Sequence, residues 1–202
     1  MLQIKSFVFG PIETNTYIVS DENGSVWLID PACLNSREQQ QVLDYISTLP
    51  AFRTSDIHII ATHGHFDHLW GATWACEQFG VPVLIHPNDL ELAQSVQQQY
   101  ELFGIHKKAT PFPIKPLFPS DLPFTILHTP GHTPGSMCLY WEKEKTLFSG
   151  DTLFRMGFGR TDLPGGDYNR LLHSLEQLFT LPPDTKVYPG HGFPTTIAQE
   201  MH

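Results

Sequence analysis

The chain has few cysteines, no long apolar run and few basic residues, and each shortage excludes a class of protein. Its three cysteines, Cys33, Cys76 and Cys138, are an odd number without a C-x-x-C spacing. This argues against a disulfide framework and favours reduced thiols in a cytoplasmic protein. No apolar stretch is long enough to cross a bilayer, so no membrane partner is expected. With 12 lysines and arginines against 21 acidic residues, the net charge of −9 lacks the basic footprint that binding to nucleic acid needs.

What the chain does contain is an ordinary globular composition, in which apolar strands alternate with helices. A length of 202 residues with 41% hydrophobic residues predicts one domain over 1–202. Runs rich in β-branched and aromatic residues predict strands, and apolar residues at helical spacing predict helices between them, which together indicate an α/β fold. Strands are expected over 2–9, 16–20, 25–29, 57–61, 81–85, 124–127, 136–141, 146–149 and 186–188, and helices over 36–49, 69–79, 88–103 and after 167.

Local signals predict several of the boundaries. Ser36-x-x-Gln39 is a capping-box pattern, Gly80 is a C-terminal cap, and Asn88 or Asp89 can cap the helix that runs to about 103. The stretch 104–123 contains five prolines, which exclude a regular helix or a central strand. It is either a long surface connection or a loop that borders the active site.

The candidate chemistry begins with Thr62-His63-Gly64-His65-Phe66-Asp67-His68, which directly follows a predicted buried strand. In an extended chain, His63, His65 and Asp67 share one side, and His68 can join them where the chain turns into a helix. Imidazole nitrogens and a carboxylate that meet at the end of a strand suit a borderline divalent metal such as zinc. The stretch therefore predicts a metal site.

Three further loops also follow predicted strands and carry a single metal-binding side chain, namely His132, Asp151 and His191. Seven ligands are too many for one tetrahedral ion, but they divide between two ions if one carboxylate bridges them. Asp30 ends an early strand and is either a turn residue or a partner that holds a ligand histidine. The remaining histidines are expected to be packed or exposed without a role, with His128 the most plausible exception because it lies near His132.

The motif T-H-G-H-F-D-H, followed by separate His, Asp and His positions, resembles the metallo-β-lactamase superfamily. The segments 131–136, 149–154 and 188–192 resemble its glyoxalase II branch, in a short form without the C-terminal helical domain of the longer enzymes. The resemblance implies a four-layer αβ/βα sandwich with the metals at one edge of two facing sheets. It implies a first metal on His63, His65 and His132, a second on Asp67, His68 and His191, and Asp151 as the bridge, with Asp30 behind a ligand.

The same resemblance implies hydrolysis of a small-molecule thioester, with S-(2-hydroxyacyl)glutathione as the favoured substrate. Two bound divalent ions, zinc by preference and iron or manganese as alternatives, would lower the pKa of the attacking water, and Asp67 would orient it. A thiolate leaves readily at neutral pH, so no strong general acid is required. Arg160, or a lysine of the stretch 107–115, is expected to meet a carboxylate of the substrate.

A second hypothesis remains open because the loop Gly159-Arg160-Thr161-Asp162 also resembles that of persulfide dioxygenases. Such an enzyme would hold a single iron on His63, His132 and Asp151, the arrangement of two histidines and one carboxylate found in non-haem iron sites. Hydrolysis of a lactam, a lactone or a phosphodiester is a weaker third possibility. Neither the physiological substrate nor the oligomeric state follows from the sequence.

Overall fold

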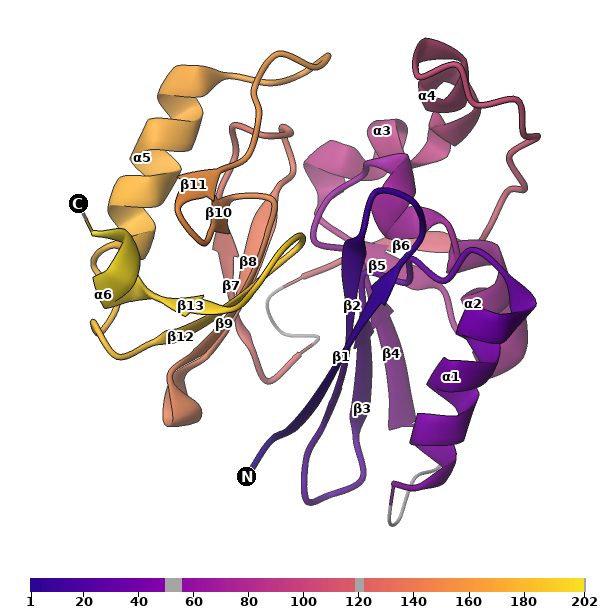
Figure 1. Cartoon of the computed structure of the whole chain (residues 1–202), viewed down its shortest axis with the longest axis horizontal. Coiled ribbons are helices and arrows are strands. Elements are labelled where there is room, and N and C mark those ends of the chain that lie inside the picture. Colours follow the sequence, from indigo (N-terminus) through magenta and orange to yellow (C-terminus); the bar gives the residue numbers. More distant parts are fainter. Residues whose placement is uncertain (50–55, 119–121, 202) are drawn as a thin grey trace.

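Two β-sheets lie face to face in the middle of the molecule, and helices cover the outer face of each (Figure 1). The computed structural model describes residues 1–49, 56–118 and 122–201. The first sheet contains, in spatial order, β1 (Gln3–Phe9), β2 (Thr14–Ser20), β3 (Val26–Ile29), β4 (Ile57–Ile60), β5 (Val83–Ile85) and β6 (Ile114–Pro116). The second contains β13 (Thr195–Thr196), β12 (Lys186–Pro189), β9 (Thr146–Gly150), β8 (Met137–Trp141) and β7 (Thr125–His128). A small hairpin of β10 (Leu153–Phe154) and β11 (Gly157–Phe158) stands apart from both.

Both sheets are mixed, and their topology brings the candidate ligand loops to one edge. In the first sheet β3, β4, β5 and β6 are parallel, whereas β2 is antiparallel to both of its neighbours, β1 and β3. In the second, β9 and β12 are parallel, and β8 is antiparallel to both β7 and β9. Because the carboxyl ends of parallel strands lie at the same edge, the segments that follow β3, β4, β7, β9 and β12 meet there.

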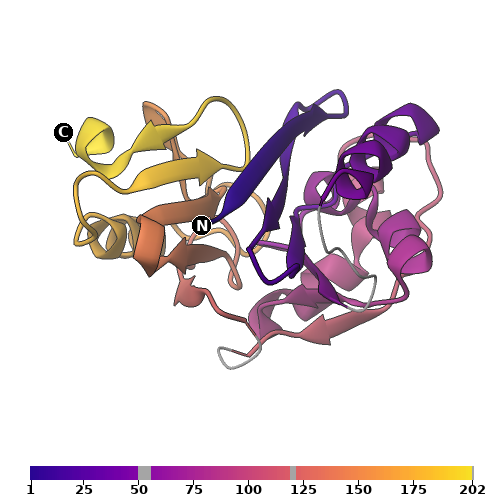
Figure 2. The ribbon, with the colours of Figure 1, turned by 90° about the horizontal axis from the view of Figure 1, so that it is seen from below.

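Alternation along the strands produces the four predicted layers. In β2, Tyr17 and Val19 pack with Phe148 of β9 between the two sheets, whereas Ile18 faces the helices. On the helix side, the first sheet packs against α1 (Ser36–Ser47), α2 (Ala72–Phe79), α3 (Leu90–Gln94) and α4 (Val96–Leu102). The second sheet packs against α5 (Tyr168–Leu178) and α6 (Ile197–Glu200). Figure 2 shows the sheets between these helical layers from below. The four-layer αβ/βα sandwich is confirmed, and no helix among the described residues is long and apolar enough to span a membrane.

The local helix signals were only partly right. Gly80 caps α2 in the left-handed conformation as expected. The capping box is wrong by one position, because the N-cap of α1 is Asn35, whose side chain accepts from the backbone N–H groups of Arg37 and Glu38. The helix expected from 88 or 89 to about 103 is divided into α3 and α4, and Asp89 makes no capping hydrogen bond to α3. The Asp89 side chain has a different role, described below.

The proline-rich stretch forms an edge strand as well as a connection. Within it, β6 pairs only with β5, which a proline-containing strand can do because its other side needs no donor. None of the described residues in 104–118 lines the cavity above the candidate ligands, so the alternative of a loop bordering the active site finds no support there. Residues 119–121 lie outside the described part of the chain.

Candidate metal centre

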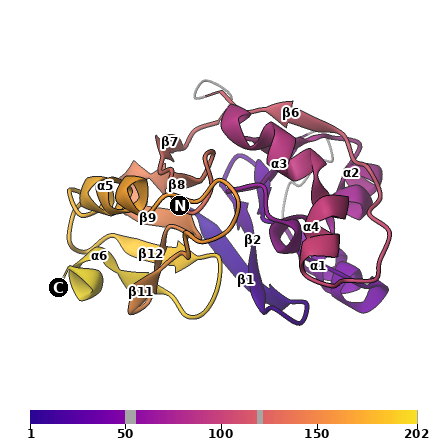
Figure 3. The ribbon, with the colours of Figure 1, turned by 90° about the horizontal axis from the view of Figure 1, so that it is seen from above.

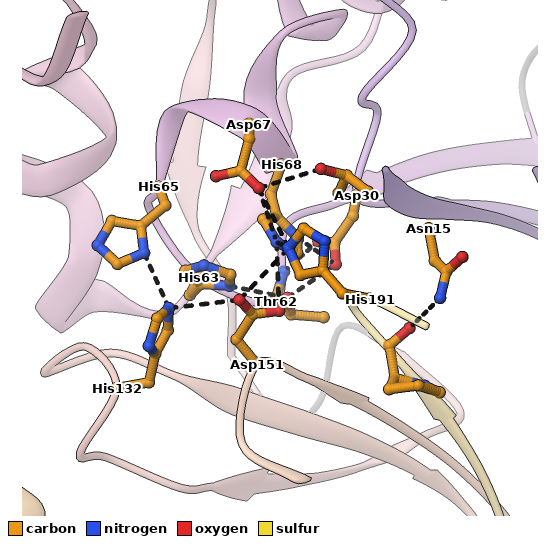
Figure 4. Close-up of polar contacts among 12 residues, drawn as sticks. Asn15, Asp30, Thr62, His63, His65, Asp67, His68, His132, Asp151 and His191 are labelled. Carbon is orange, nitrogen blue, oxygen red and sulfur yellow. Dashed lines mark hydrogen bonds and ion pairs between the residues drawn. The ribbon is translucent and has the colours of Figure 1, made fainter. Parts of the chain in front are cut away.

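The chain turns sharply after β4 and gathers the predicted ligands of its main motif. His63 and His65 lie in the extended segment after β4, and Asp67 and His68 lie in a short 3₁₀ helix, Phe66–Leu69. All four side chains are buried. His132 comes from the loop after β7, Asp151 from the end of β9 and His191 from the end of β12 (Figure 4). The structure thus brings all seven predicted ligands together from four loops and both sheets.

The seven side chains form two triads that share a neighbour. One triad is His63, His65 and His132, and the other is Asp67, His68 and His191; within each triad the ligand atoms lie within 4.8 Å of one another. Asp151 belongs between them: its Oδ2 lies 3.5 Å from Nε2 of both His132 and His191. A third such group, His63, His68 and Asp151, takes one histidine from each triad, so Asp151 lies next to both.

The atoms inside the cluster fit a metal better than they fit one another. Nε2 of His68 and Nε2 of His191 are 3.3 Å apart, and because Nδ1 of each ring lies beside an oxygen acceptor, both rings present a lone pair there when neutral. Nδ1 of His65 lies 2.9 Å from Nε2 of His132. Nε2 of His63 and Oδ1 of Asp151 are buried without any hydrogen-bond partner. Buried polar atoms are rarely left unpaired, and imidazole and carboxylate together suit divalent ions. The residues therefore fit a pair of divalent metals.

Hydrogen bonds behind the candidate ligands fix which nitrogen faces the cluster. Nδ1 of His132 donates to the carbonyl of Arg160 at 2.7 Å, and Nδ1 of His191 is 3.2 Å from the carbonyl of Ile12. Nδ1 of His68 donates to Oδ2 of Asp30 at 2.9 Å. With Nδ1 occupied, Nε2 of each ring is presented to the metal position, the arrangement that a ligand histidine needs.

Asp30 supports both triads at once. Its carboxylate accepts from the backbone N–H of Thr62 at 2.7 Å and from the Thr62 hydroxyl at 2.8 Å, and that hydroxyl lies 3.2 Å from Nδ1 of His63. Asp30 has a φ of 52°, a left-handed conformation that is uncommon for a residue with a side chain. Such strain is typical of functional positions. These contacts agree with the alternative in which Asp30 stands behind a candidate ligand histidine, and a plain turn residue would not make them.

The charges of the site differ between the two triads, and the second triad is surrounded by carboxylates. Burial lowers the pKa of His65 to about 3 and, with the neighbouring histidines, lowers that of His63 well below its ordinary value, so both are neutral at pH 7. Burial also disfavours the charge of His68, but Asp67, Asp151 and Asp30 outweigh it and raise the His68 pKa well above its usual range. Burial raises the pKa of Asp67, yet His68 and His191 hold it below its ordinary value. The second triad thus attracts positive charge.

Asp89 is a residue of this site that the sequence analysis misassigned. It is fully buried and accepts three hydrogen bonds, from Gly64 N–H at 2.8 Å, Gly135 N–H at 2.6 Å and the Thr133 hydroxyl at 2.6 Å. Burial raises the pKa of Asp89, and these hydrogen bonds oppose that rise. Asp89 therefore joins the loop that carries His63 and His65 to the loop that carries His132. No local pattern distinguishes it from a helix cap.

Two other supporting residues were also missed. The Thr14 hydroxyl donates to Oδ2 of Asp67 at 3.0 Å and so holds that carboxylate toward the second triad. The Asn15 side chain donates to the carbonyls of Pro189 and Gly192, each at 2.9 Å, and clasps the turn that carries His191 (Figure 4). Both residues begin β2 of the first sheet, whereas His191 follows β12 of the second. They hold the two sheets together at the site.

One of the glycines before a ligand is required by space. A Cβ at Gly190 would overlap Oδ1 of Asp151 and approach the His68 ring. A side chain at this position would therefore displace groups that are themselves candidate ligands.

A cavity of about 380 Å³ opens above the two triads and gives a substrate access to them. Besides candidate ligands it is lined by Ile12, Phe66, Phe103, Phe154, Phe158, Leu163 and Arg160. Arg160 therefore lies within reach of a ligand in the cavity, and its contact with a substrate carboxylate stays a prediction. The alternative cations, Lys107, Lys108 and Lys115, do not line this cavity.

Among the described residues, the other histidines and the cysteines do not enter the cluster. His58 stacks on Trp27, with ring centroids 6.4 Å apart, and His173 bonds within α5. His128, the expected exception, stacks on His86 at 4.0 Å and bonds to the carbonyl of Pro134. All three cysteines are free and buried, and burial raises the pKa of the Cys138 thiol to about 11.

The sandwich and the paired triads at its edge are those of a metallo-hydrolase of the metallo-β-lactamase fold. The family model "Metallo-beta-lactamase superfamily" matches residues 9–191, and the chain belongs to that superfamily. A relative from Bacillus subtilis named "probable metallo-hydrolase YqgX" is 36% identical, over 95% of this chain and 91% of that protein. Hydroxyacylglutathione hydrolase GloC of Haemophilus influenzae is 32% identical, over 93% of this chain and 90% of that one. The crystal structure of TTHA1623 in a di-iron-bound form is 36% identical, with a TM-score of 0.84 over 96% of both chains.

Proposed function

We propose that this chain is a thioester hydrolase that uses two divalent metal ions, zinc by preference, with S-(2-hydroxyacyl)glutathione as the first substrate to test. The observation that carries the proposal is the pair of complete triads joined by Asp151 at the floor of a cavity open to solvent. The name of the Haemophilus influenzae relative supports the choice of substrate. The di-iron form of the other relative keeps iron as the alternative metal.

The reaction adds water to the thioester carbonyl carbon and breaks the C–S bond, which yields a carboxylic acid and a thiol. Bound metals supply the acidity of the water and the stabilisation of the carbonyl oxygen. Asp67 lines the cavity with its carboxylate held by Thr14, so it orients the water toward the carbonyl. His132 and His191 are held from behind by backbone carbonyls, and this keeps the floor of the cavity rigid. The departing thiolate, with a thiol pKa of about 8.5, needs no protein acid.

The test is metal analysis of the purified protein together with turnover of S-D-lactoylglutathione. The expected result is two metals per chain and equal release of D-lactate and free thiol. His191→Ala should lose one metal and most of the turnover. His173→Ala changes an exposed position on α5 and should keep two metals and the wild-type turnover.

The persulfide dioxygenase hypothesis gives the opposite result in the same experiment. It requires one iron per chain on His63, His132 and Asp151, with rapid oxygen uptake on glutathione persulfide. The completeness of the second triad favours hydrolysis, although a single-iron enzyme could retain Asp67, His68 and His191 unused, so metal stoichiometry decides between the two. One iron with fast oxygen consumption and no thioester turnover would overturn the proposal.

A further inference from the structure

A second, smaller hollow opens beside the candidate metal centre and continues its cavity. The hollow has a volume of about 170 Å³ and shares His65, Phe103 and Leu163 with the larger cavity. Its other walls come from α3, α4 and the segment between them on one side and from Pro164 on the other: Leu92, Ser95, Gln98, Gln99 and Leu102. We call this hollow the annex. Figure 3 shows α3 and α4 on one side of the molecule, across from α5.

No side chain that lines the annex is charged at pH 7, since the pKa of His65 is lowered and its ring is neutral there, and two of the polar side chains already make hydrogen bonds within the protein. The Gln99 side chain accepts from Phe66 N–H at 2.9 Å and donates to the carbonyls of Gly64 and Leu92 at 3.0 and 2.8 Å. The Ser95 hydroxyl donates to the Leu92 carbonyl at 2.7 Å. The third polar side chain of the lining, Gln98, is exposed at the surface. A polar ligand group placed deeper than Gln98 would exchange its hydrogen bonds with water for an apolar wall, which costs free energy.

Two large apolar side chains at the mouth of the annex are exposed to solvent. Leu102 is 62% exposed and Phe103 is 42% exposed. Phe103 also packs on Phe66, with ring centroids 5.1 Å apart, so it is held in place beside the candidate ligands. Exposed apolar groups that border a cavity mark a place where an apolar partner is buried.

The cavity also offers little to an anionic substrate. Arg160 is the cation among the described residues that line it, and its guanidinium already donates to both oxygens of Asp162, at 2.7 Å each. A carboxylate that binds Arg160 must displace or share that partner. Glutathione carries two carboxylates and an ammonium group, and neither the annex nor the cavity offers each of them a partner.

We infer that the annex binds an uncharged apolar arm of the thioester substrate, and that the preferred substrate carries at most one carboxylate, bound by Arg160. The inference rests on the proposed thioester hydrolysis but changes the expected carrier from glutathione to an apolar or small neutral thiol. At roughly 30 Å³ for a group of the size of a water molecule, the annex holds an arm of about six heavy atoms. This arm is the far end either of the acyl chain or of the thiol that carries it.

The test uses the metal-loaded protein and two series of thioesters. In the first, the acyl chain of S-acyl-N-acetylcysteamine grows from acetyl to octanoyl; in the second, an acetyl group is carried by thiols of growing length. In one of the series we expect kcat/KM to rise about three- to fourfold per methylene up to about six carbons, the ratio expected when each methylene is buried, and then to level off. S-D-lactoylglutathione should be a poorer substrate than the best member of that series.

Variants assign the effect to the annex. Leu102→Glu places a charge at its mouth on an exposed position and should remove the rise with chain length. Leu172→Glu makes the same change on the exposed face of α5 and should keep the rise. A rise that survives Leu102→Glu, or flat series in which S-D-lactoylglutathione is best, would overturn the annex while leaving thioester hydrolysis intact.

A binding measurement makes the annex testable apart from catalysis. S-alkyl-N-acetylcysteamine thioethers lack the carbonyl and are not hydrolysed, and their dissociation constants should follow the same dependence on chain length. Thioether binding that tightens to about six carbons supports the annex even if no thioester is turned over, a result that would reject only the proposed function. Binding that is independent of chain length rejects the annex.

Discussion

Asp89 Oδ1 accepts a hydrogen bond of 2.6 Å from the backbone N–H of Gly135, so a residue beside α3 holds the loop that carries His132. Its other oxygen accepts from Gly64 and Thr133. One buried carboxylate therefore sets the distance between the two loops that form the first triad. A small displacement of either loop would separate His65 from His132, since their facing nitrogens are 2.9 Å apart.

The first prediction is that Asp89→Ala weakens the first metal site and the fold together. It leaves the buried N–H groups of Gly64 and Gly135 without an acceptor, whereas the Thr133 hydroxyl can still donate to Ser136 Oγ. Each unsatisfied group costs about 1–3 kcal/mol, so we expect a loss of roughly 2–6 kcal/mol in the free energy of unfolding. Urea unfolding and zinc competition with a chelator measure the two effects. Asp89→Asn keeps the size of the side chain but turns an amide N–H toward a backbone donor. Its stability and zinc affinity should lie between those of the wild type and those of Asp89→Ala. Asp44→Asn, an exposed aspartate on α1, is the control. Wild-type zinc affinity in Asp89→Ala would contradict the role.

The second prediction concerns Asp30, which holds His68 directly and His63 through Thr62. Asp30→Asn should lower metal affinity about 10- to 100-fold, the range typical of removing a partner from behind a ligand histidine. The second site should suffer more, because His68 loses an acceptor whereas His63 still faces the Thr62 hydroxyl. Stoichiometry against free metal concentration separates the sites. Two equally weakened sites would show that Asp30 acts on the fold and not on His68.

The third prediction distinguishes the triads by removing one ligand from each. His65→Ala should empty the first site and His191→Ala the second, so that each variant binds one metal per chain where the wild type binds two. Ligand binding to the folded state stabilises it by about 2.7 kcal/mol at a concentration 100 times the dissociation constant, so each variant should also gain less thermal stability from added zinc. Two metals in either variant would show that the triads are not separate sites.

The loops of the site were predictable because they are local in the sequence. His63, His65, Asp67 and His68 occupy six consecutive positions after an apolar run, and His132, Asp151 and His191 each follow a glycine after a predicted strand. The parallel order of β3, β4, β7, β9 and β12 then brings these segments to one edge. Strand periodicity and metal chemistry together were therefore enough to pick out the candidate ligands that the structure brings together.

The supporting contacts were not predictable because they join segments far apart along the chain. Asp89 is 46 positions from Gly135, and Asn15 is 174 positions from Pro189. Asp89 also follows Pro87-Asn88, a helix-start signal that explains an aspartate without any tertiary contact. The annex depends on how α4 meets the segment at Leu163 and Pro164, which no periodicity records.

The fourth prediction tests whether Arg160 is held back by Asp162. The guanidinium lowers the pKa of Asp162 to about 2, so the pair is ionised throughout the neutral range. Asp162→Asn should free Arg160 and raise kcat/KM a few-fold for a thioester that carries a carboxylate, but not for a neutral one. Asp184→Asn removes an equally exposed partner from Lys145 and serves as the matched control. An equal gain for charged and neutral substrates would place the effect elsewhere.

The fifth prediction is a pH effect that lies away from the candidate ligands. Burial, with the stacked ring of His128, lowers the pKa of His86 to about 4 from an ordinary value near 6.5. The unfolded chain therefore binds a proton at His86 between these values when the folded chain does not, so stability falls as pH falls from about 6.5 toward 4. His86→Gln cannot titrate, and its amide oxygen can still accept from Asn88 N–H, as Nδ1 of His86 does at 3.2 Å. In metal-free protein, the stability of the wild type relative to His86→Gln should decline from pH 7.5 to pH 5, measured by urea unfolding, with His173→Gln as the control for the loss of an exposed histidine. A difference between wild type and His86→Gln that stays constant over this range would show that the stacked pair accepts the proton without cost.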